Sequence, residues 1–464
     1  MAKKDKGART RLLVLVATGI SSFVTPFMSS SINIALPAIG RELMLDAVSL
    51  GWVASASLLS SAMLLLPFGR VADIYGRRGL FAAGLLLYFL ASLWAGLAQS
   101  GPSLLGARVF QGVAGAMIFS TGLAILTAAY PAEKAGWSLG INTACTYLGL
   151  SLGPFLGGIL TRYLGWRAVF GINLPFSIGA LALAGFIPKC EPGGVNRGGF
   201  DFVGSVVYAG AVLSLMFGLT RLPESYAFIL TLAGIAGMVA FLFWELRSPS
   251  PIFNLSLFRH NQVFAFSNLA ALINYSATAA VGLLLSLYLQ YVKGLDAETA
   301  GMILVGQPVV MAVFSPIAGR LSDRIEPRVI ASIGMATTAM GLLLFIFLTA
   351  DTGLVLVIAG LLLVGFGFAL FSAPNTNAVM GVVARKDYGI GSATLGTMRL
   401  LGQMLSLGLA TMLLRIFVGR TRLGPQSQPG LVRVLRPAFI LFSLLCTAGV
   451  FASLARGKSL LSKH

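Results

Sequence analysis

The feature that most limits the fold of this chain is a series of about fourteen apolar runs, each long enough to cross a lipid bilayer. Only 10% of the 464 residues are charged and 57% are hydrophobic, whereas soluble proteins carry about 25% charged residues. We therefore predict an all-α integral membrane protein. Its predicted spans cover residues 12–36, 49–68, 79–98, 103–130, 138–161, 167–187, 203–221, 226–244, 263–291, 299–318, 328–349, 353–383, 390–417 and 437–455.

Two polar segments between spans share one pattern, GRVADIYGRR at 69–78 and GRLSDRIEPR at 319–328. A pattern that recurs once in the same setting predicts two related halves. We expect the glycines to allow close backbone approach and the aspartates to accept bonds from arginines or helix N-termini. The residues predicted to act in conformational gating here are Gly69, Asp73, Gly76, Arg77, Gly319 and Asp323.

Segments rich in proline and glycine, 188–202 and 246–262, flank a pair of spans that has almost no internal polar residues. This pair interrupts the two related halves. We predict an N-terminal six-helix bundle at 1–187, a linker with two inserted transmembrane helices at 188–262, and a C-terminal six-helix bundle at 263–464.

The net charge of +18 is spread over short loops, so it indicates membrane orientation and contact with anionic lipids rather than nucleic acid. About 21 Lys and Arg residues fall on the side of the N-terminus and about 10 on the other side, which predicts cytoplasmic N- and C-termini in a multi-pass inner-membrane protein. One predicted outer loop opposes this bias, since it holds Arg420, Arg422, Arg433 and Arg436.

Several function classes are disfavoured by what the chain lacks. Three cysteines are too few for a disulfide framework, and two distant histidines, His260 and His464, form no metal cluster. We find no grouped acid, base and nucleophile for an enzyme, and no P-loop pattern for direct use of ATP. No cofactor is predicted, and we expect a monomer.

Several motifs resemble those of the major facilitator superfamily. Segment 69–78 fits the family's loop motif Gly-x-x-x-Asp-x-x-Gly-Arg-Lys/Arg, although Ile74 stands where the family usually has a basic residue. RVFQG at 108–112 resembles its Arg-x-x-Gln-Gly motif, and GPFLGG at 153–158 is similar to its antiporter motif. The inserted pair, with GWR at 165–167 and INLP at 172–175, is similar to the fourteen-span drug:proton antiporter branch. The resemblance implies two six-helix bundles plus two linker helices.

The fifth predicted span carries a face of small residues. Gly149, Gly153 and Gly157 recur every four residues and so share one side of a helix, where a neighbouring helix can pack closely. Pro154 removes one helical hydrogen bond and can kink the span. We expect Gly153, Pro154, Gly157 and Gly158 to act in gating at an interface between the bundles. Ordinary close packing in a static bundle is the alternative.

Two arginines, Arg108 and Arg399, lie inside predicted spans. A charge in lipid is costly, so each should face a cavity or a polar partner; pairing with backbone carbonyls near a helix end is the alternative. The resemblance links Arg108 to proton transfer. The side chains predicted to line a substrate-binding cavity are Met28, Ser31, Asn33, Arg108, Gln111, Asn142, Asn274, Gln307, Asn375, Asn377, Arg399 and Gln403. For the amides, interhelical hydrogen bonds are the alternative.

The first span departs from the family. The fourteen-span branch usually reads Leu-Asp-x-Thr-Ile-Val-Asn-Val-Ala-Leu-Pro, and FMSSSINIALP at 27–37 fits it except that Met28 replaces the aspartate. Every other acidic residue falls in a predicted loop, in the tail or near a helix end. We therefore expect neutral or anionic amphipathic substrates, and proton coupling that is peripheral, carried by the substrate or absent.

These observations predict a secondary transporter that exports hydrophobic or amphipathic compounds across the cytoplasmic membrane by alternating access, as multidrug-efflux proteins do. One alternative is an organic-anion symporter or facilitator that uses Arg108 and Arg399. Another is a membrane sensor that no longer transports.

Overall fold

The computed structural model describes residues 2–130, 132–187, 199–253, 255–322, 324–383, 388–419 and 423–457. Long helices run antiparallel to their neighbours in sequence. The helices of the first half are α1 (Ala2–Glu42), α2 (Ala47–Tyr75), α3 (Arg77–Gly96), α4 (Gly101–Ala129), α5 (Ala132–Tyr163), α6 (Arg167–Gly171) and α7 (Asn173–Ala184). The next are α8 (Phe202–Arg221), α9 (Ser225–Glu245) and the short α10 (Leu255–His260).

The second half repeats the antiparallel order with more breaks within its spans. Its elements are α11 (Gln262–Thr278), α12 (Val281–Leu287), the π-helix η1 (Tyr288–Val292), α13 (Ala297–Leu304), α14 (Gly306–Leu321), α15 (Pro327–Leu344), the 3₁₀ turn η2 (Phe345–Phe347), α16 (Leu354–Gly381), α17 (Tyr388–Phe417), the 3₁₀ turn η4 (Pro425–Ser427) and α18 (Gln428–Leu454).

Fourteen helical segments of the described residues are long and apolar enough to cross a membrane, which confirms the predicted number. Most bounds agree with the apolar runs to within a few residues. The last span is the main correction, because it begins at Gln428 rather than at 437. Arg433 and Arg436 lie exposed in the first turns of α18, so charged residues at a helix end hid the true start of the helix.

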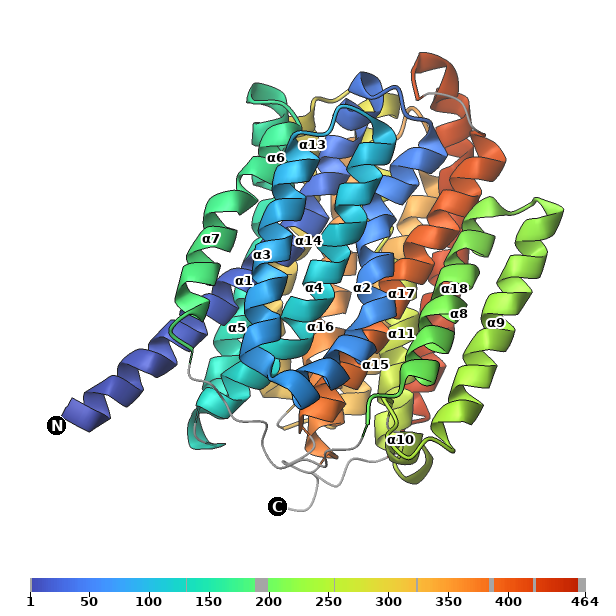
Figure 1. Cartoon of the computed structure of the whole chain (residues 1–464). Helices are drawn as coiled ribbons and strands as arrows, with labels where there is room; N and C mark the ends of the chain where they lie inside the picture. Colours follow the sequence, from blue (N-terminus) through green and yellow to red (C-terminus); the bar gives the residue numbers. More distant parts are fainter. Residues whose placement is uncertain are drawn as a thin grey trace.

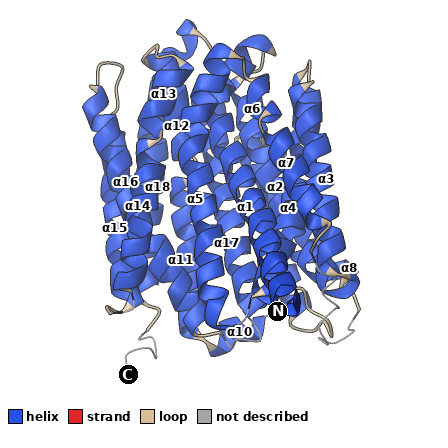
Figure 2. Cartoon of the chain, turned by 90° about the vertical axis from the view of Figure 1, so that its left-hand side faces the viewer, coloured by secondary structure: helices blue, strands red, loops and turns tan. Residues whose placement is uncertain are grey.

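The spans form two bundles with an inserted pair at their side. In Figure 2 most of the second bundle, α11–α18, lies to the left and most of the first, α1–α7, lies to the right, with α5 and α17 between them in this view. Helices α8 and α9 stand at one edge in Figure 1, where α8 packs on α2 of the first bundle and α17 of the second. We call the end of the molecule with α10 the lower end, and the end with α6 and α13 the upper end (Figure 1). The predicted boundaries of the three domains stay a proposal.

In both repeated polar segments, the turn between the helices is shorter than the ten residues of the sequence pattern. Helix α2 continues through most of the first segment, and only Gly76, with φ +105°, separates it from α3. The glycine therefore provides a left-handed backbone conformation. At Gly69 an added methyl group would meet nothing within 4 Å, so the expected close approach is wrong there. Asp73 forms an ion pair with Arg77, with 2.9 Å between Oδ1 and Nη2. An arginine partner is what we predicted for this aspartate.

The second polar segment differs from the first in its local structure. Helix α14 ends at Leu321 and α15 begins at Pro327, so several residues separate the two helices here. A methyl group at Gly319 would lie 3.8 Å from Ala373, which is ordinary contact. Asp323 lies outside the described residues, and its predicted role is untouched by the structure.

Candidate functional site

The two bundles are hydrogen-bonded to each other at the upper end, between α1 and the segment α12–η1. Pro37 has no N–H, so the carbonyl of Asn33 lacks its helical donor. The hydroxyl of Ser286 in the other bundle donates to that carbonyl at 2.6 Å. Gln290 donates from Nε2 to the carbonyl of Ile34 at 3.0 Å. A proline in one bundle thus exposes the acceptor that the other bundle binds.

The predicted glycine face of α5 packs within the first bundle. Gly149, Gly153 and Gly157 all contact α1, and a methyl group at Gly149 would lie 2.3 Å from the carbonyl oxygen of Phe23. Ser31 of α1 donates to the carbonyl of Gly153 at 2.8 Å. These three glycines therefore allow close packing inside one bundle. Gly153 and Gly157 contact α1 rather than the other bundle, contrary to the expected position, and their role in gating stays a prediction.

The other two residues of the motif do lie between the bundles. A methyl group at Gly158 would lie 2.5 Å from the carbonyl oxygen of Ala297 in α13. In the reverse direction, a methyl group at Gly301 would lie 2.3 Å from the carbonyl oxygen of Pro154. Helices α5 and α13 thus touch through their backbones.

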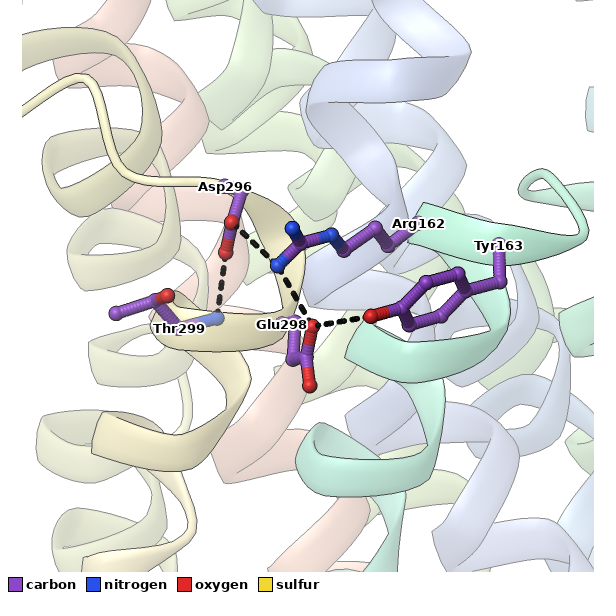
Figure 3. A network of polar contacts seen from close by, with 5 residues as sticks. All are labelled: Arg162, Tyr163, Asp296, Glu298 and Thr299. Atoms are coloured by element: carbon purple, nitrogen blue, oxygen red, sulfur yellow. Dashed lines mark hydrogen bonds and ion pairs between the residues drawn. The ribbon is translucent and has the colours of Figure 1, made fainter.

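A network of charged side chains covers this contact (Figure 3). Arg162 of α5 pairs with Asp296 and with Glu298 of α13, at 2.7 Å each, and the hydroxyl of Tyr163 donates to Glu298 at 3.3 Å. The backbone N–H of Thr299 and the guanidinium of Arg162 lower the pKa of Asp296. We call these five residues the upper latch. Sequence reasoning missed it because its residues lie at the ends of two helices that are far apart in sequence.

Near the middle of the molecule, Arg399 has few partners. Its Nη2 donates to the hydroxyl of Thr376 at 2.6 Å, and its guanidinium carbon lies 5.8 Å from the ring centre of Tyr275. Its Nε is buried without a hydrogen-bond partner, and in the described residues no carboxylate pairs with it. Gln403, one turn along α17, is half-buried.

Helices of both bundles contribute to the surroundings of Arg399. The hydroxyl of Tyr147 in α5 donates to the hydroxyl of Ser372 in α16 at 3.2 Å. Tyr275 of α11 meets the ring of Phe368 edge-on, with centres 5.2 Å apart, and it lies within electrostatic reach of Arg399 and Tyr147. We call Arg399, Thr376, Tyr275, Ser372 and Tyr147 the central cluster. It offers one cation, hydroxyl groups and aromatic faces.

The sequence identified only part of the central cluster. Arg399 is recognisable because it is a charge within an apolar run. The hydroxyls of Ser372 and Thr376 gave no such signal, since such side chains commonly bond to their own helix; Thr376 indeed also donates to the carbonyl of Ser372 at 2.8 Å.

Arg108 lies inside the first bundle and is only 2% exposed. Its Nε donates to the carbonyl of Val53 at 3.0 Å, and its Nη1 donates to Gln111 at 2.7 Å. Gln111 in turn donates to the hydroxyl of Ser92 at 3.0 Å. This arrangement matches the structural alternative of backbone pairing, and it links α2, α3 and α4.

Two other predicted amides lie near the lower end of the second bundle. Asn375 accepts a hydrogen bond from buried Arg456 at 3.0 Å and donates to the carbonyl of Ser267 at 3.1 Å. Burial lowers the pKa of Arg456 to about 10. Asn377 donates to the hydroxyl of Ser322, at the end of α14, at 2.8 Å. Both amides make interhelical bonds.

The remaining predicted residues are spread over both bundles. Met28 accepts a hydrogen bond on its sulfur from Asn173 at 3.0 Å, and Asn142 accepts from Ser22 at 2.8 Å. Asn274 is fully buried, and both polar atoms of its amide lack partners in the described residues. Asn33 and Gln307 are half-buried. The structure does not bring the twelve predicted residues into one cavity, and their roles in substrate binding stay predictions.

The protein-family comparison decides the identity of this architecture. A model described as Major Facilitator Superfamily matches residues 18–268 and again residues 267–459. The chain belongs to the major facilitator superfamily. Its two successive matches meet close to the start of α11, so each half of the chain is similar to the same family pattern.

Curated relatives in the superfamily include transporters with different named substrates. The chain is 31% identical over 422 residues to the multidrug resistance protein Stp of Mycobacterium tuberculosis, covering 89% of this chain and 78% of Stp. It is 33% identical over 416 residues to the cephamycin export protein CmcT of Amycolatopsis lactamdurans, covering 87% and 84%. It is 29% identical over 395 residues to the riboflavin transporter RibZ of Clostridioides difficile, covering 84% and 85%.

Solved structures agree with the superfamily fold. A bacterial homolog of the human lysosomal transporter Spinster, in an inward-facing and unoccupied conformation, aligns with a TM-score of 0.66. The alignment covers 96% of this chain and 97% of the homolog, at 18% identity. The chain is therefore a multi-pass membrane transporter of the major facilitator superfamily, with two six-helix bundles and two additional helices.

Proposed function

We propose that this chain exports hydrophobic or amphipathic organic compounds across the cytoplasmic membrane by alternating access. In this proposal the lower end faces the cytoplasm, which the distribution of Lys and Arg supports. The observation that carries it is the contact between the bundles at the upper end, which we call the upper seam: the bonds from Ser286 and Gln290 and the backbone contact at Gly158 join the bundles there. In alternating access, a closed outer end is the state in which substrate exchanges with the cytoplasmic side, and exporters and importers share it. The names of Stp and CmcT support the direction.

The central cluster is the proposed binding site. In this proposal the protein acts as a monomer in the lipid bilayer. Aromatic rings at Tyr275 and Phe368 suit an apolar substrate body, and Arg399 lacks a carboxylate partner in the described part of the chain. The site therefore favours neutral or anionic amphipaths over cations. Any use of protons would rest on peripheral groups or on the substrate itself.

A second candidate function is transport of organic anions by symport or facilitated diffusion. The buried, unpartnered Nε of Arg399 favours it, because an anionic group could accept that bond. Arg108 supports it less, since its described bonds are to Val53 and Gln111. The name of RibZ makes riboflavin a sensible trial compound.

Transport by purified protein in proteoliposomes tests these functions. We would compare riboflavin, which is uncharged at neutral pH, with a carboxylated amphipathic dye, a neutral lipophilic drug and a quaternary ammonium dye, each with and without a pH gradient. Arg399→Gln should reduce transport of an anionic compound roughly ten- to hundredfold, the equivalent of losing one charge-assisted hydrogen bond of about 1.5–3 kcal/mol. Arg259→Gln, at an exposed arginine of α10, is the control.

Each outcome separates the candidates. Retained transport of neutral compounds in Arg399→Gln favours the exporter, and loss of all transport favours the anion carrier. Strong gradient-driven export of the ammonium dye would contradict both candidate functions, because each of them predicts neutral or anionic substrates. Ligand binding without counterflow would indicate the transport-dead sensor.

A further inference from the structure

Two buried carboxylates face each other at the lower end of the inserted pair. Asp201 precedes α8 and is 8% exposed, and Glu245 ends α9 and is 4% exposed. A methyl group at Gly204 would lie 2.8 Å from Oδ2 of Asp201 and 3.0 Å from Oε1 of Glu245. The two carboxylate oxygens therefore lie next to the same small space beside Gly204. In the described residues no other carboxylate is buried to this degree.

Asp201 has the surroundings of an anion. It accepts hydrogen bonds from the backbone N–H of Gly204 at 2.7 Å and from the hydroxyl of Ser248 at 2.7 Å. The indole N–H of Trp244 donates to it as well, at 2.9 Å to Oδ2. Donors of this kind bind the charged form of a carboxylate, and they surround the carboxylate that lies beside Glu245.

Glu245 has the opposite surroundings. Its Oε2 accepts the backbone N–H of Phe253 at 3.0 Å, but its Oε1 is buried and has no hydrogen-bond partner in the described residues. A carboxylate that is buried and close to a second negative charge is strongly unfavourable. A proton on Oε1 removes the charge and adds a donor.

No described basic group relieves this crowding. Asp201 is the charged residue whose field acts on Glu245, and no arginine or lysine of the described chain forms an ion pair with either carboxylate. The nearest basic residues in the following segment, Arg247, Arg259 and His260, are exposed. We propose that Glu245 is a proton-binding site, carrying its proton on Oε1 in this packing.

The proton site lies where the inserted pair joins the second bundle. Phe253, whose N–H is held by Glu245, packs on Phe258 with ring centres 5.2 Å apart. Phe258 packs edge-on against Phe264 of α11 at 5.0 Å. Loss of the proton would set two negative charges against each other and strain this connection. The pH at the lower end thereby acts on the segment that leads into α11.

Infrared spectroscopy on the full chain, in a detergent without ester groups, tests the proposal directly. The wild type at neutral pH should show the C=O stretching band of a protonated carboxyl, which disappears on alkaline titration. Glu245→Gln should lack this titrating band, and Glu298→Gln, at the upper latch, should keep it. Absence of the band from the wild type, or an unchanged band in Glu245→Gln, would overturn the proposal.

A second variant tests the same proton site if Glu245→Gln does not fold. Asp201→Asn removes the neighbouring negative charge, so Glu245 should release its proton at a lower pH than in the wild type. The titration midpoint of the band should shift downward. An unchanged midpoint would mean that the band belongs to another group, and the proposal would fail.

Discussion

The hydroxyl of Ser286 donates to the backbone carbonyl of Asn33 at 2.6 Å, across the boundary between the two bundles. The acceptor is available because Pro37 cannot donate to it within α1. Closure of the upper end thus satisfies a polar group that lacks its helical partner, and opening leaves that group to find another donor. In a superfamily that works by alternating access, this bond favours the conformation with a closed upper end.

Ser286→Ala should therefore shift the protein toward opening at the upper end. The substitution also removes the bond that Ser286 accepts from Gln290 at 3.1 Å, but that bond lies within the second bundle. Loss of the one bond between the bundles, about 1 kcal/mol, corresponds to roughly a fivefold change in the population ratio. Spin labels at Leu164 and Val355, which are 72% and 80% exposed, would report the opening as a longer distance, in a background without the three native cysteines. Ser276→Ala is the matched control because its hydroxyl bonds within its own helix, to Leu272. Equal distances in both variants would contradict the prediction.

The backbone contact between α5 and α13 should be intolerant of any side chain. Gly158→Ala places a methyl group 2.5 Å from the carbonyl oxygen of Ala297, and a backbone atom cannot move aside as a flexible side chain can. We expect the methyl group to push α5 and α13 apart at the upper end, and we expect at least a tenfold loss of transport, measured in proteoliposomes. Gly140→Ala, on the same helix, meets nothing within 4 Å and should transport normally. Normal transport by Gly158→Ala would show that this seam is not held as tightly as the structure indicates.

These contacts show which parts of the fold could be predicted from the sequence. Hydrophobicity over about 20 residues is a local property, so all fourteen spans were predictable. Partners across the boundary were not, because Ser286 reads as an ordinary hydroxyl and Arg162 as an ordinary loop charge. Their roles arise only when distant segments meet. The glycine face on α5 was visible in the sequence, but the helix it packs against was not.

Arg108 should prove necessary for stability more than for substrate recognition. Arg108→Ala removes a hydrogen bond to the carbonyl of Val53 and leaves the buried Oε1 of Gln111 without its partner, and a buried unsatisfied group costs about 1–3 kcal/mol. We expect a clear loss of thermal stability in detergent. Arg399→Ala, whose arginine makes one hydrogen bond, should reduce stability far less. A stable Arg108→Ala with abolished transport would instead support the predicted substrate role.

The upper latch should hold through mildly acidic conditions. The N–H of Thr299 and Arg162 lower the pKa of Asp296, so its contribution is complete above about pH 3.9, the ordinary aspartate value, and is lost only as the pH falls through the lower folded value. The Leu164–Val355 label distance should therefore stay constant from about pH 7.5 to about pH 5.5.

Arg162→Gln removes both ion pairs of the latch at once. Because such exposed pairs contribute about 0.2–1 kcal/mol each, the ratio of open to closed protein should rise by no more than roughly thirtyfold, and the rise should vanish at high salt, where the wild-type pairs are screened too. Arg328→Gln, which breaks a pair with Glu326 at the lower end, should leave the upper distance unchanged. An upper end that opens between pH 7.5 and 5.5 in the wild type would mean that a group other than Asp296 controls the latch, and Glu298 would be the next to replace.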